Sequence, residues 1–230
     1  RSDCAATWAR LFNEHLAYLL DQHKDRFRGL ATVPIQDGRL AAKELEYAVS
    51  TLGMLGVMWA TDPVGQDLAR DDIEPLWETA EGLNVPVVLH PPTHGFGANV
   101  KPSHLAFSLG RTMDTTITAT KLILGGIFDR HPELKIVLVH GGGYLPYQAG
   151  RIDQGYQTLQ EKPSKLQRGN PSDYLSLLYY DTVAMSPQAV SMIRNIAGAD
   201  HIVLGSDYVF SGPERSLMEP VERAGLTSSE

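Results

Sequence analysis

Short apolar runs alternate along the chain with longer segments in which apolar residues recur at helical spacing. The runs are rich in Val, Ile and Leu, which is typical of strands covered on both faces. They predict strands at residues 30–35, 56–61, 85–90, 136–140, 176–182 and 201–207. The longer segments predict amphipathic helices at about 8–19, 40–52, 73–83, 113–128, 144–159 and 187–197. This alternation favours an α/β fold with parallel strands and right-handed crossovers.

Local signals mark some of the boundaries between these elements. Asp72 is placed to cap the helix that begins at Ile73, with Pro75 tolerated in its first turn. A segment rich in Pro, Gly and His, residues 91–103, predicts a loop. The polar segment 161–172 predicts a second loop at the surface.

Six strand–helix units leave two architectures open. The units form either an open doubly wound sheet or a barrel whose ends lie outside this chain. No glycine-rich phosphate loop follows the first strand, and Gly141-Gly142-Gly143 lacks the spacing of a nucleotide-binding motif. A nucleotide-binding fold is therefore disfavoured. From the length of the chain we expect one domain over residues 1–230.

Composition excludes several classes of protein. The hydrophobic fraction of 43% and the charged fraction of 20% are ordinary for a globular protein. The net charge of −7, without a Lys/Arg cluster, argues against a nucleic-acid surface. No apolar run approaches the roughly 18 residues of a membrane span. The single cysteine, Cys4, cannot form an internal disulfide, which suits a cytoplasmic protein.

Three predicted strands end at a residue that can bind a metal or move a proton: His90, His140 and Asp207. The carboxyl ends of parallel strands are where barrel and open α/β enzymes hold their chemistry. Imidazole and carboxylate groups are common ligands of zinc and similar metals. These three residues therefore predict one site.

The residues that follow each strand end sharpen this prediction. After His90, Pro91 and Pro92 turn the chain out of the strand, so the imidazole is expected at the rim. Three glycines follow His140, which suggests that a substrate or a bound water approaches the backbone closely. Asp207 either caps a helix or, after a fully apolar strand, needs a metal or another partner.

Other candidates carry weaker signals. Asp181 ends the strand before the last one, and either takes part in the chemistry or holds a ligand by a hydrogen bond. Arg151 is either a solvated side chain or a carboxylate-binding group. His94 and His104, after His90, are solvated or contact substrate. The remaining histidines are interpreted as surface, helix-end or strand-start groups: His15, His23, His131 and His201.

Several segments together resemble a known family. They are Gly29–Ile35, Pro86–Pro91, His131–Pro146, Gly150–Asp153 and His201–Tyr208. The chain resembles the amidohydrolase-related metal enzymes, in the branch that contains aminocarboxymuconate-semialdehyde decarboxylase and γ-resorcylate decarboxylase. The resemblance covers nearly the whole chain. His140-Gly-Gly-Gly followed later by Gly205-Ser-Asp207 is fairly specific for this branch, but not for a substrate.

The resemblance implies a (β/α)8 barrel, of which the six predicted strands correspond to the third to the eighth. It implies that His90 and Asp207 bind a divalent metal, zinc or alternatively manganese, and that His140 is the acid/base beside it. Arg151 matches an arginine that reaches the substrate carboxylate of a neighbouring subunit, which implies a homodimer. The family also has a His-x-His pair on its first strand, and no such pair occurs here. We therefore expect a barrel domain truncated at both ends.

Three functions follow from these residues. The leading hypothesis is metal-dependent, non-oxidative decarboxylation of an aromatic or unsaturated carboxylic acid, with His140 as the proton donor. The second is hydrolysis of an ester, lactone or amide by the same groups. The third, motivated by the missing His-x-His, is a barrel fragment without activity.

Overall fold

The computed structural model describes residues 2–61, 67–92, 100, 103–163, 165–208, 210 and 216–226. Within these residues five parallel strands form one sheet in the order β1-β2-β3-β4-β5. They are β1 (Val57–Ala60), β2 (Val87–His90), β3 (Ile136–Leu138), β4 (Tyr179–Asp181) and β5 (Ile202–Val203). Each strand pairs with the next one along the chain.

This strand order decides between the two architectures. A doubly wound sheet reverses its strand order at a switch point, whereas a βα barrel adds each strand beside the last. The described strands follow the second pattern without a reversal. The chain is therefore an arc of a (β/α)8-type barrel, as the resemblance implied.

The strand expected at 30–35 is reduced to a single parallel bridge between Ala31 and Val57. Ala31 donates its N–H to the Gly56 carbonyl and accepts from the Met58 N–H. Pro34 has no N–H to extend the ladder, and its carbonyl instead accepts from Asp37 in a turn. The bridge keeps this segment at the edge of the sheet, beside β1.

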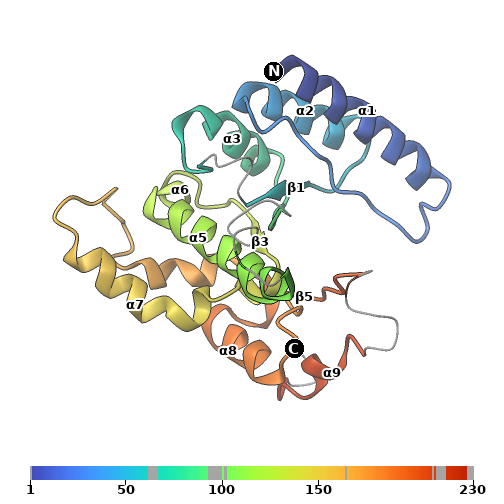
Figure 1. The fold of residues 1–230 in the computed structure, drawn as a ribbon. Helices are drawn as coiled ribbons and strands as arrows, with labels where there is room; N and C mark the ends of the chain where they lie inside the picture. The colour runs from blue at the N-terminus through green and yellow to red at the C-terminus, as the bar shows by residue number, and fades with distance from the viewer. Residues whose placement is uncertain are drawn as a thin grey trace.

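Helices surround the strands on the outside of the arc (Figure 1). The longer ones are α1 (Ser2–Asp21), α2 (Gly38–Ser50), α3 (Glu74–Gly82), α5 (Arg111–Leu124), α7 (Leu145–Thr158) and α8 (Pro187–Ala197). Short helices are α4 (Ser103–Leu105), α6 (Ile127–Arg130) and α9 (Glu219–Glu222). A π-helix, η3 (Ala106–Gly110), joins α4 to α5. Short 3-10 turns are η1 (Asp71–Ile73), η4 (His140–Gly142), η5 (Pro171–Leu177) and η6 (Ala199–His201).

Two predicted helix boundaries were wrong. Asp72 does not cap α3; it lies within the η1 turn, and its carboxylate accepts from the Arg70 guanidinium. The helix expected at 113–128 is two helices, because Gly126 takes a left-handed conformation and separates α5 from α6. That conformation is inexpensive only for glycine.

The core lies between the sheet and the helices. The side chains of Val57, Val87, Leu89 and Ile136 are fully buried along the strands. On the helix side Trp77 packs against Trp59 of β1, with ring centroids 5.2 Å apart. The buried strands hold the carboxyl ends of β1 to β4 in a fixed relation, which positions the site described below.

Helix α1 (the dark blue helix of Figure 1) departs from the expected burial. Trp8 and Phe12, two large apolar residues of the helix expected at about 8–19, are 73% and 57% exposed. The buried contact is polar: the Asn13 amide donates to the Thr32 carbonyl and to Glu44, and its oxygen accepts from the Thr32 N–H. Helix α1 therefore attaches by hydrogen bonds and by a small cluster around Ala48 and Met54.

His131 lies at a helix end, one of the two positions expected for it, but it is not at the surface. Its ring is buried at the end of α6, where Nε2 lies 2.9 Å from Glu74 and Nδ1 lies 3.1 Å from Glu81. Arg130 makes two hydrogen bonds to the same Glu74. This network joins α3 to the segment that leads into β3, at the opposite end of the strands from His90 and His140.

Candidate active site

Three of the sequence-predicted residues meet at the carboxyl end of the sheet. His90 is the last residue of β2, His140 follows β3, and Asp207 lies four residues beyond β5. One ligand atom of each lies within 4.8 Å of the other two. His140 Nε2 is 4.0 Å from Asp207 Oδ2, and the two imidazole centroids are 5.5 Å apart. In the described residues this is the one cluster suited to hold a metal ion.

The backbone is strained at two of these residues. His140 has φ of 57° and Asp207 has φ of 49°, a region that side chains other than glycine rarely adopt. Each such residue costs about 1–3 kcal/mol, and strain of this kind concentrates at functional sites. Asp207 does not begin a helix among the described residues; its carbonyl accepts from the Phe210 N–H in a turn.

The three glycines after His140 are explained by packing within the protein. Gly141, Gly142 and Gly143 all have positive φ, so the turn needs glycine at each of them. A Cβ on Gly142 would lie 2.8 Å from the Tyr180 ring, and one on Gly143 would collide with the Thr112 carbonyl. Packing therefore accounts for these glycines, and a close approach of substrate or a bound water stays a prediction. The glycines let η4 pack between β4 and α5.

Asp181 holds this turn in place. Its buried Oδ1 accepts from the backbone N–H of Gly141, at 2.8 Å, and from that of Val183, at 3.0 Å. Burial raises the pKa of Asp181 to about 6, although the hydrogen bonds from Gly141, His140 and Val183 act to lower it. Asp181 lies outside the three-residue cluster and fixes the backbone from which His140 projects.

Both imidazoles favour the neutral form. Burial lowers the pKa of His90, and it lowers the pKa of His140 to about 4, with His90 as the next cause. The nearby Asp207 carboxylate opposes both shifts without overcoming them. A neutral imidazole is the form that binds a metal or accepts a proton.

The two histidines differ in their hydrogen bonds. His90 Nδ1 lies 3.0 Å from the Pro91 carbonyl, an arrangement that makes this nitrogen the donor and leaves Nε2 available. His140 Nδ1 is buried and has no hydrogen-bond partner among the described residues. An unpaired buried nitrogen is costly, and a bound water, an ion or a catalytic role is among the reasons why a folded protein retains one.

Arg111 is a residue of this region that the sequence reasoning missed. It is the first residue of α5, and its charge acts to lower the pKa of both His90 and His140. Its guanidinium carbon lies 4.9 Å from the centroid of the Phe107 ring and 5.7 Å from that of Phe210. No sequence motif marks Arg111, because its neighbours come from a π-helix and from a turn 99 residues later.

The other candidates lie apart from the cluster. Arg151 is on the exposed side of α7, and His104 is exposed on α4. His94 lies outside the described residues. His201, at the start of β5, stacks on Tyr179 with ring centroids 4.3 Å apart.

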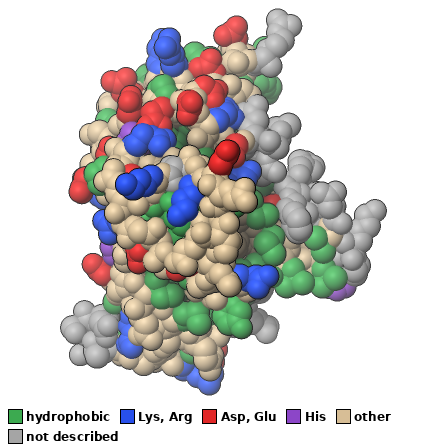
Figure 2. Space-filling view, turned by 90° about the vertical axis from the view of Figure 1, so that its left-hand side faces the viewer, with side chains coloured by type: hydrophobic (Ala, Val, Ile, Leu, Met, Phe, Trp, Pro, Cys, Tyr) green, Lys and Arg blue, Asp and Glu red, His purple; other side chains and the backbone are tan. Residues whose placement is uncertain are grey.

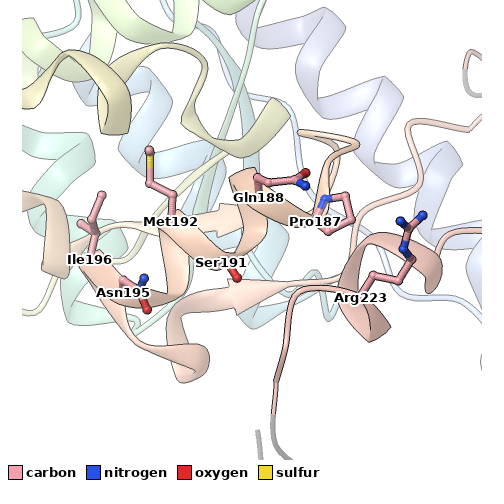
Figure 3. Close-up of a pocket in the computed structure, with 7 residues that line it drawn as sticks. All are labelled: Pro187, Gln188, Ser191, Met192, Asn195, Ile196 and Arg223. Atoms are coloured by element: carbon pink, nitrogen blue, oxygen red, sulfur yellow. The ribbon is translucent and has the colours of Figure 1, made fainter.

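A groove along α8 and α9 offers no alternative site (Figure 3). Its seven lining residues are Pro187, Gln188, Ser191, Met192, Asn195, Ile196 and Arg223. The one charged group among them, Arg223, is paired with Glu219. The groove contains no histidine, cysteine or carboxylate in its lining, so it lacks groups for metal binding or proton transfer.

On the face seen in Figure 2, acidic and basic side chains are interspersed, and no basic patch forms. No described helix is both long enough and apolar enough to cross a bilayer.

Comparison with known proteins identifies the family. An amidohydrolase family model matches residues 2–229. The 2-amino-3-carboxymuconate-6-semialdehyde decarboxylase of Dictyostelium discoideum is 28% identical over 96% of this chain. The γ-resorcylate decarboxylase of Polaromonas sp. is 35% identical over 88% of this chain. The chain spans 63% of the first relative and 66% of the second.

A solved structure supports the same assignment. The dihydroxybenzoic acid decarboxylase of Polaromonas sp. JS666, solved with manganese and the inhibitor 2-nitroresorcinol, superposes with a TM-score of 0.82 at 29% identity. The match covers 99% of this chain and 72% of that one. The expected resemblance to the decarboxylase branch is thus confirmed, and the chain belongs to the amidohydrolase family.

Proposed function

We propose that this protein is a metal-dependent decarboxylase of an aromatic or unsaturated carboxylic acid. The observation that carries the proposal is the convergence of His90, His140 and Asp207 at the carboxyl ends of the strands. The relatives reported above, which are decarboxylases of such acids, support the reaction type.

The residues fit a divalent metal. His90 keeps Nε2 available while Nδ1 faces the Pro91 carbonyl, and the Asp207 carboxylate lies beside the two imidazoles. We assign His90 and Asp207 as ligands, and His140 Nε2, which lies 4.0 Å from the Asp207 carboxylate, is the ring nitrogen that faces them. Manganese in the Polaromonas structure supports that metal for this chain, and zinc fits the same donors. When bound, the metal would polarise a substrate oxygen.

His140 moves the proton in this proposal. The bond from the substrate carbon to its carboxylate breaks, CO2 leaves, and the electron pair stays on the carbon. That carbon then takes a proton from the His140 imidazolium, and solvent restores the proton to the ring. Because the pKa of His140 is lowered to about 4, the ring is mostly neutral at pH 7, and the imidazolium formed by proton uptake from solvent gives its proton up readily.

Arg151 keeps a separate role in the proposal. Its exposed position on α7 allows it to reach a molecule outside this chain. We propose that it contacts the substrate carboxylate of a neighbouring copy, which makes the protein a homodimer. Sedimentation of the protein should then give twice the mass of one chain.

The test measures CO2 release and metal content together. The protein is assayed with a panel of hydroxybenzoates, with and without a second carboxylate. His140→Asn should abolish CO2 release and leave the metal content near normal, whereas His90→Ala should lose the metal. His15→Asn, a change at an exposed histidine on α1, is the matched control and should alter neither.

Other outcomes would favour the two alternatives. Hydrolysis products from ester, lactone or amide substrates, without CO2 from any acid, would favour a hydrolase. Absence of both bound metal and metal-dependent turnover would favour an inactive fragment. Loss of metal in His140→Asn would make His140 a ligand and remove its assignment as the proton donor.

A further inference from the structure

Arg111 has an unusual environment for a charged side chain. It is partly buried, and its contacts in the described residues are with the rings of Phe107 and Phe210. No carboxylate of the described chain pairs with it. The faces of aromatic rings attract a cation but do not use its N–H groups, so these two ring contacts leave the hydrogen-bonding capacity of the guanidinium unused.

The two turns of the active site hold Arg111 between them. Phe210 belongs to the turn that begins at Asp207, and its N–H donates to the Asp207 carbonyl at 2.8 Å. On the other side Thr112, the next residue after Arg111, presents its carbonyl to Gly143. Tyr144 extends this contact by donating its N–H to the Thr116 hydroxyl at 2.8 Å. Arg111 is therefore tied to the segments that carry both Asp207 and His140.

The π-helix η3 contributes to this placement. Arg111 closes η3, with its N–H bonded to the Ala106 carbonyl. Single π turns within α-helices are costly and occur frequently at functional sites. Here the π turn brings Phe107 beneath Arg111 and within 6.0 Å of Phe210, measured between ring centroids. Both rings remain partly open to solvent, at 42% for Phe107 and 62% for Phe210.

We propose that Arg111, flanked by Phe107 and Phe210, is a specificity-determining residue that binds a carboxylate which the substrate retains through the reaction. A guanidinium fits a carboxylate through two parallel hydrogen bonds, and the neighbouring rings offer faces for an aromatic or unsaturated substrate. The inference rests on the proposed function and goes further by naming the substrate class as dicarboxylic acids.

The retained carboxylate follows from the chemistry of the step. The departing carboxylate loses its negative charge as it becomes CO2. A cation bound to that group would stabilise the starting acid more than the transition state and would slow the reaction. An arginine next to the site is therefore better suited to a second carboxylate, whose charge is unchanged throughout.

The test measures binding without turnover. Calorimetric titration of the metal-loaded protein compares isophthalate, which has two carboxylates, with benzoate, which has one. Isophthalate should bind more tightly to the unaltered protein. Arg111→Met should weaken isophthalate binding by about 10-fold to 100-fold, the range expected for a charged hydrogen-bonded pair, and change benzoate binding little. Arg111→Lys should restore part of the loss.

Arg39→Met is the matched control, since it removes an exposed arginine of α2 that has no role in the proposed site. Metal content and the unfolding midpoint are measured for every variant, so that a misfolded protein is recognised. Unchanged isophthalate binding in Arg111→Met, or an equal loss for both acids, would overturn the proposal. Failure of the proposed decarboxylation would be a separate result. CO2 release would then be absent, while the unaltered protein would still bind isophthalate more tightly than benzoate.

Discussion

Single residues of the active site depend on groups that do not take part in the chemistry. His140 holds a left-handed backbone conformation that an isolated residue would leave. The Asp181 carboxylate keeps it there by accepting the N–H of Gly141, the next residue along the chain. Burying the Asp181 carboxylate is unfavourable and raises its pKa. In return the carboxylate fixes the direction of the His140 imidazole.

Replacing Asp181 tests this dependence. Asp181→Ala leaves the N–H groups of Gly141 and Val183 without an acceptor, so we expect a loss of about 1–3 kcal/mol in the free energy of unfolding. Metal affinity should fall by about 10-fold to 100-fold, the usual effect of losing a group that orients a ligand. Asp181→Asn keeps an oxygen acceptor and should lose less of both. Urea unfolding measures the change in stability, and metal competition titrations measure the change in metal affinity. Equal losses in Asp181→Ala and Asp181→Asn would argue against a role for the Asp181 oxygen as a hydrogen-bond acceptor.

Sequence reasoning at this scale succeeded where one residue follows one strand. His90, His140 and Asp207 each end an apolar run, and parallel strands bring such ends together. It could not find Arg111, because the rings around that side chain come from segments that only the folded chain brings together. It expected His131 at the surface or at a helix end, and the helix end is confirmed, but its burial was not visible because its two acidic partners lie on another helix.

Elements fit together in this fold by close backbone contact. The η4 turn lies against Thr112 of α5 and Tyr180 of β4 with no room for a side chain at Gly142 or Gly143. The glycine run was visible in the sequence, but a run of glycines fits both a packing role and a substrate approach. The distances to the neighbouring elements show the packing role, and they could not be read from the sequence because they are a property of the fold.

A pair of glycine variants checks this packing. Gly143→Ala meets both the positive φ and the Thr112 carbonyl, so the free energy of unfolding should fall by about 2 kcal/mol or more. Gly150→Ala, in the middle of α7 with open space around it, should instead stabilise by about 0.5–1 kcal/mol. Thermal unfolding measures both. If Gly143→Ala left the free energy of unfolding unchanged, the η4 turn would be able to move away from α5.

The link between α3 and α6 should respond to pH. Hydrogen bonds from Arg130 are the main cause that lowers the pKa of Glu74 from its ordinary value of 4.5. The folded state therefore keeps Glu74 ionised while the unfolded chain takes up a proton. Its contribution to stability is complete above pH 4.5 and disappears as the pH falls through the lower folded value.

Glu74→Gln should accordingly destabilise the protein by about 1–3 kcal/mol at pH 7 and by much less near pH 3. Glu78→Gln, at an exposed position on the same helix, is the control and should show no such dependence. Urea unfolding at several pH values makes the comparison. If the difference in the free energy of unfolding between Glu74→Gln and the unaltered protein stayed constant with pH, the ionised network would be excluded as its cause.

The whole molecule brings together strand ends that are distant in the sequence. Residues 90, 140 and 207 span half of the chain, yet they converge because each strand lies beside the previous one. The alternation of strands and helices predicted this α/β arrangement. It could not decide between a barrel and a doubly wound sheet, since both have the same local pattern and differ only in strand order.

Metal binding should therefore stabilise the entire fold. A ligand that binds only the folded state at 100 times its dissociation constant adds about 2.7 kcal/mol. We expect a chelator to lower the melting temperature of the unaltered protein, and to have little effect on His90→Ala. Differential scanning calorimetry with and without added manganese or zinc measures this. Equal chelator effects on both proteins would remove His90 from the ligand set.

The attachment of α1 has a consequence for how the molecule opens. Asn13 holds this helix through hydrogen bonds, while much of its apolar surface stays in contact with water. Detaching α1 would thus expose little additional apolar surface, and local opening there should need less free energy than opening of the strands. In hydrogen-exchange measurements, amides of α1 should exchange early and as a cooperative unit, with those of β2 and β3 protected until global unfolding.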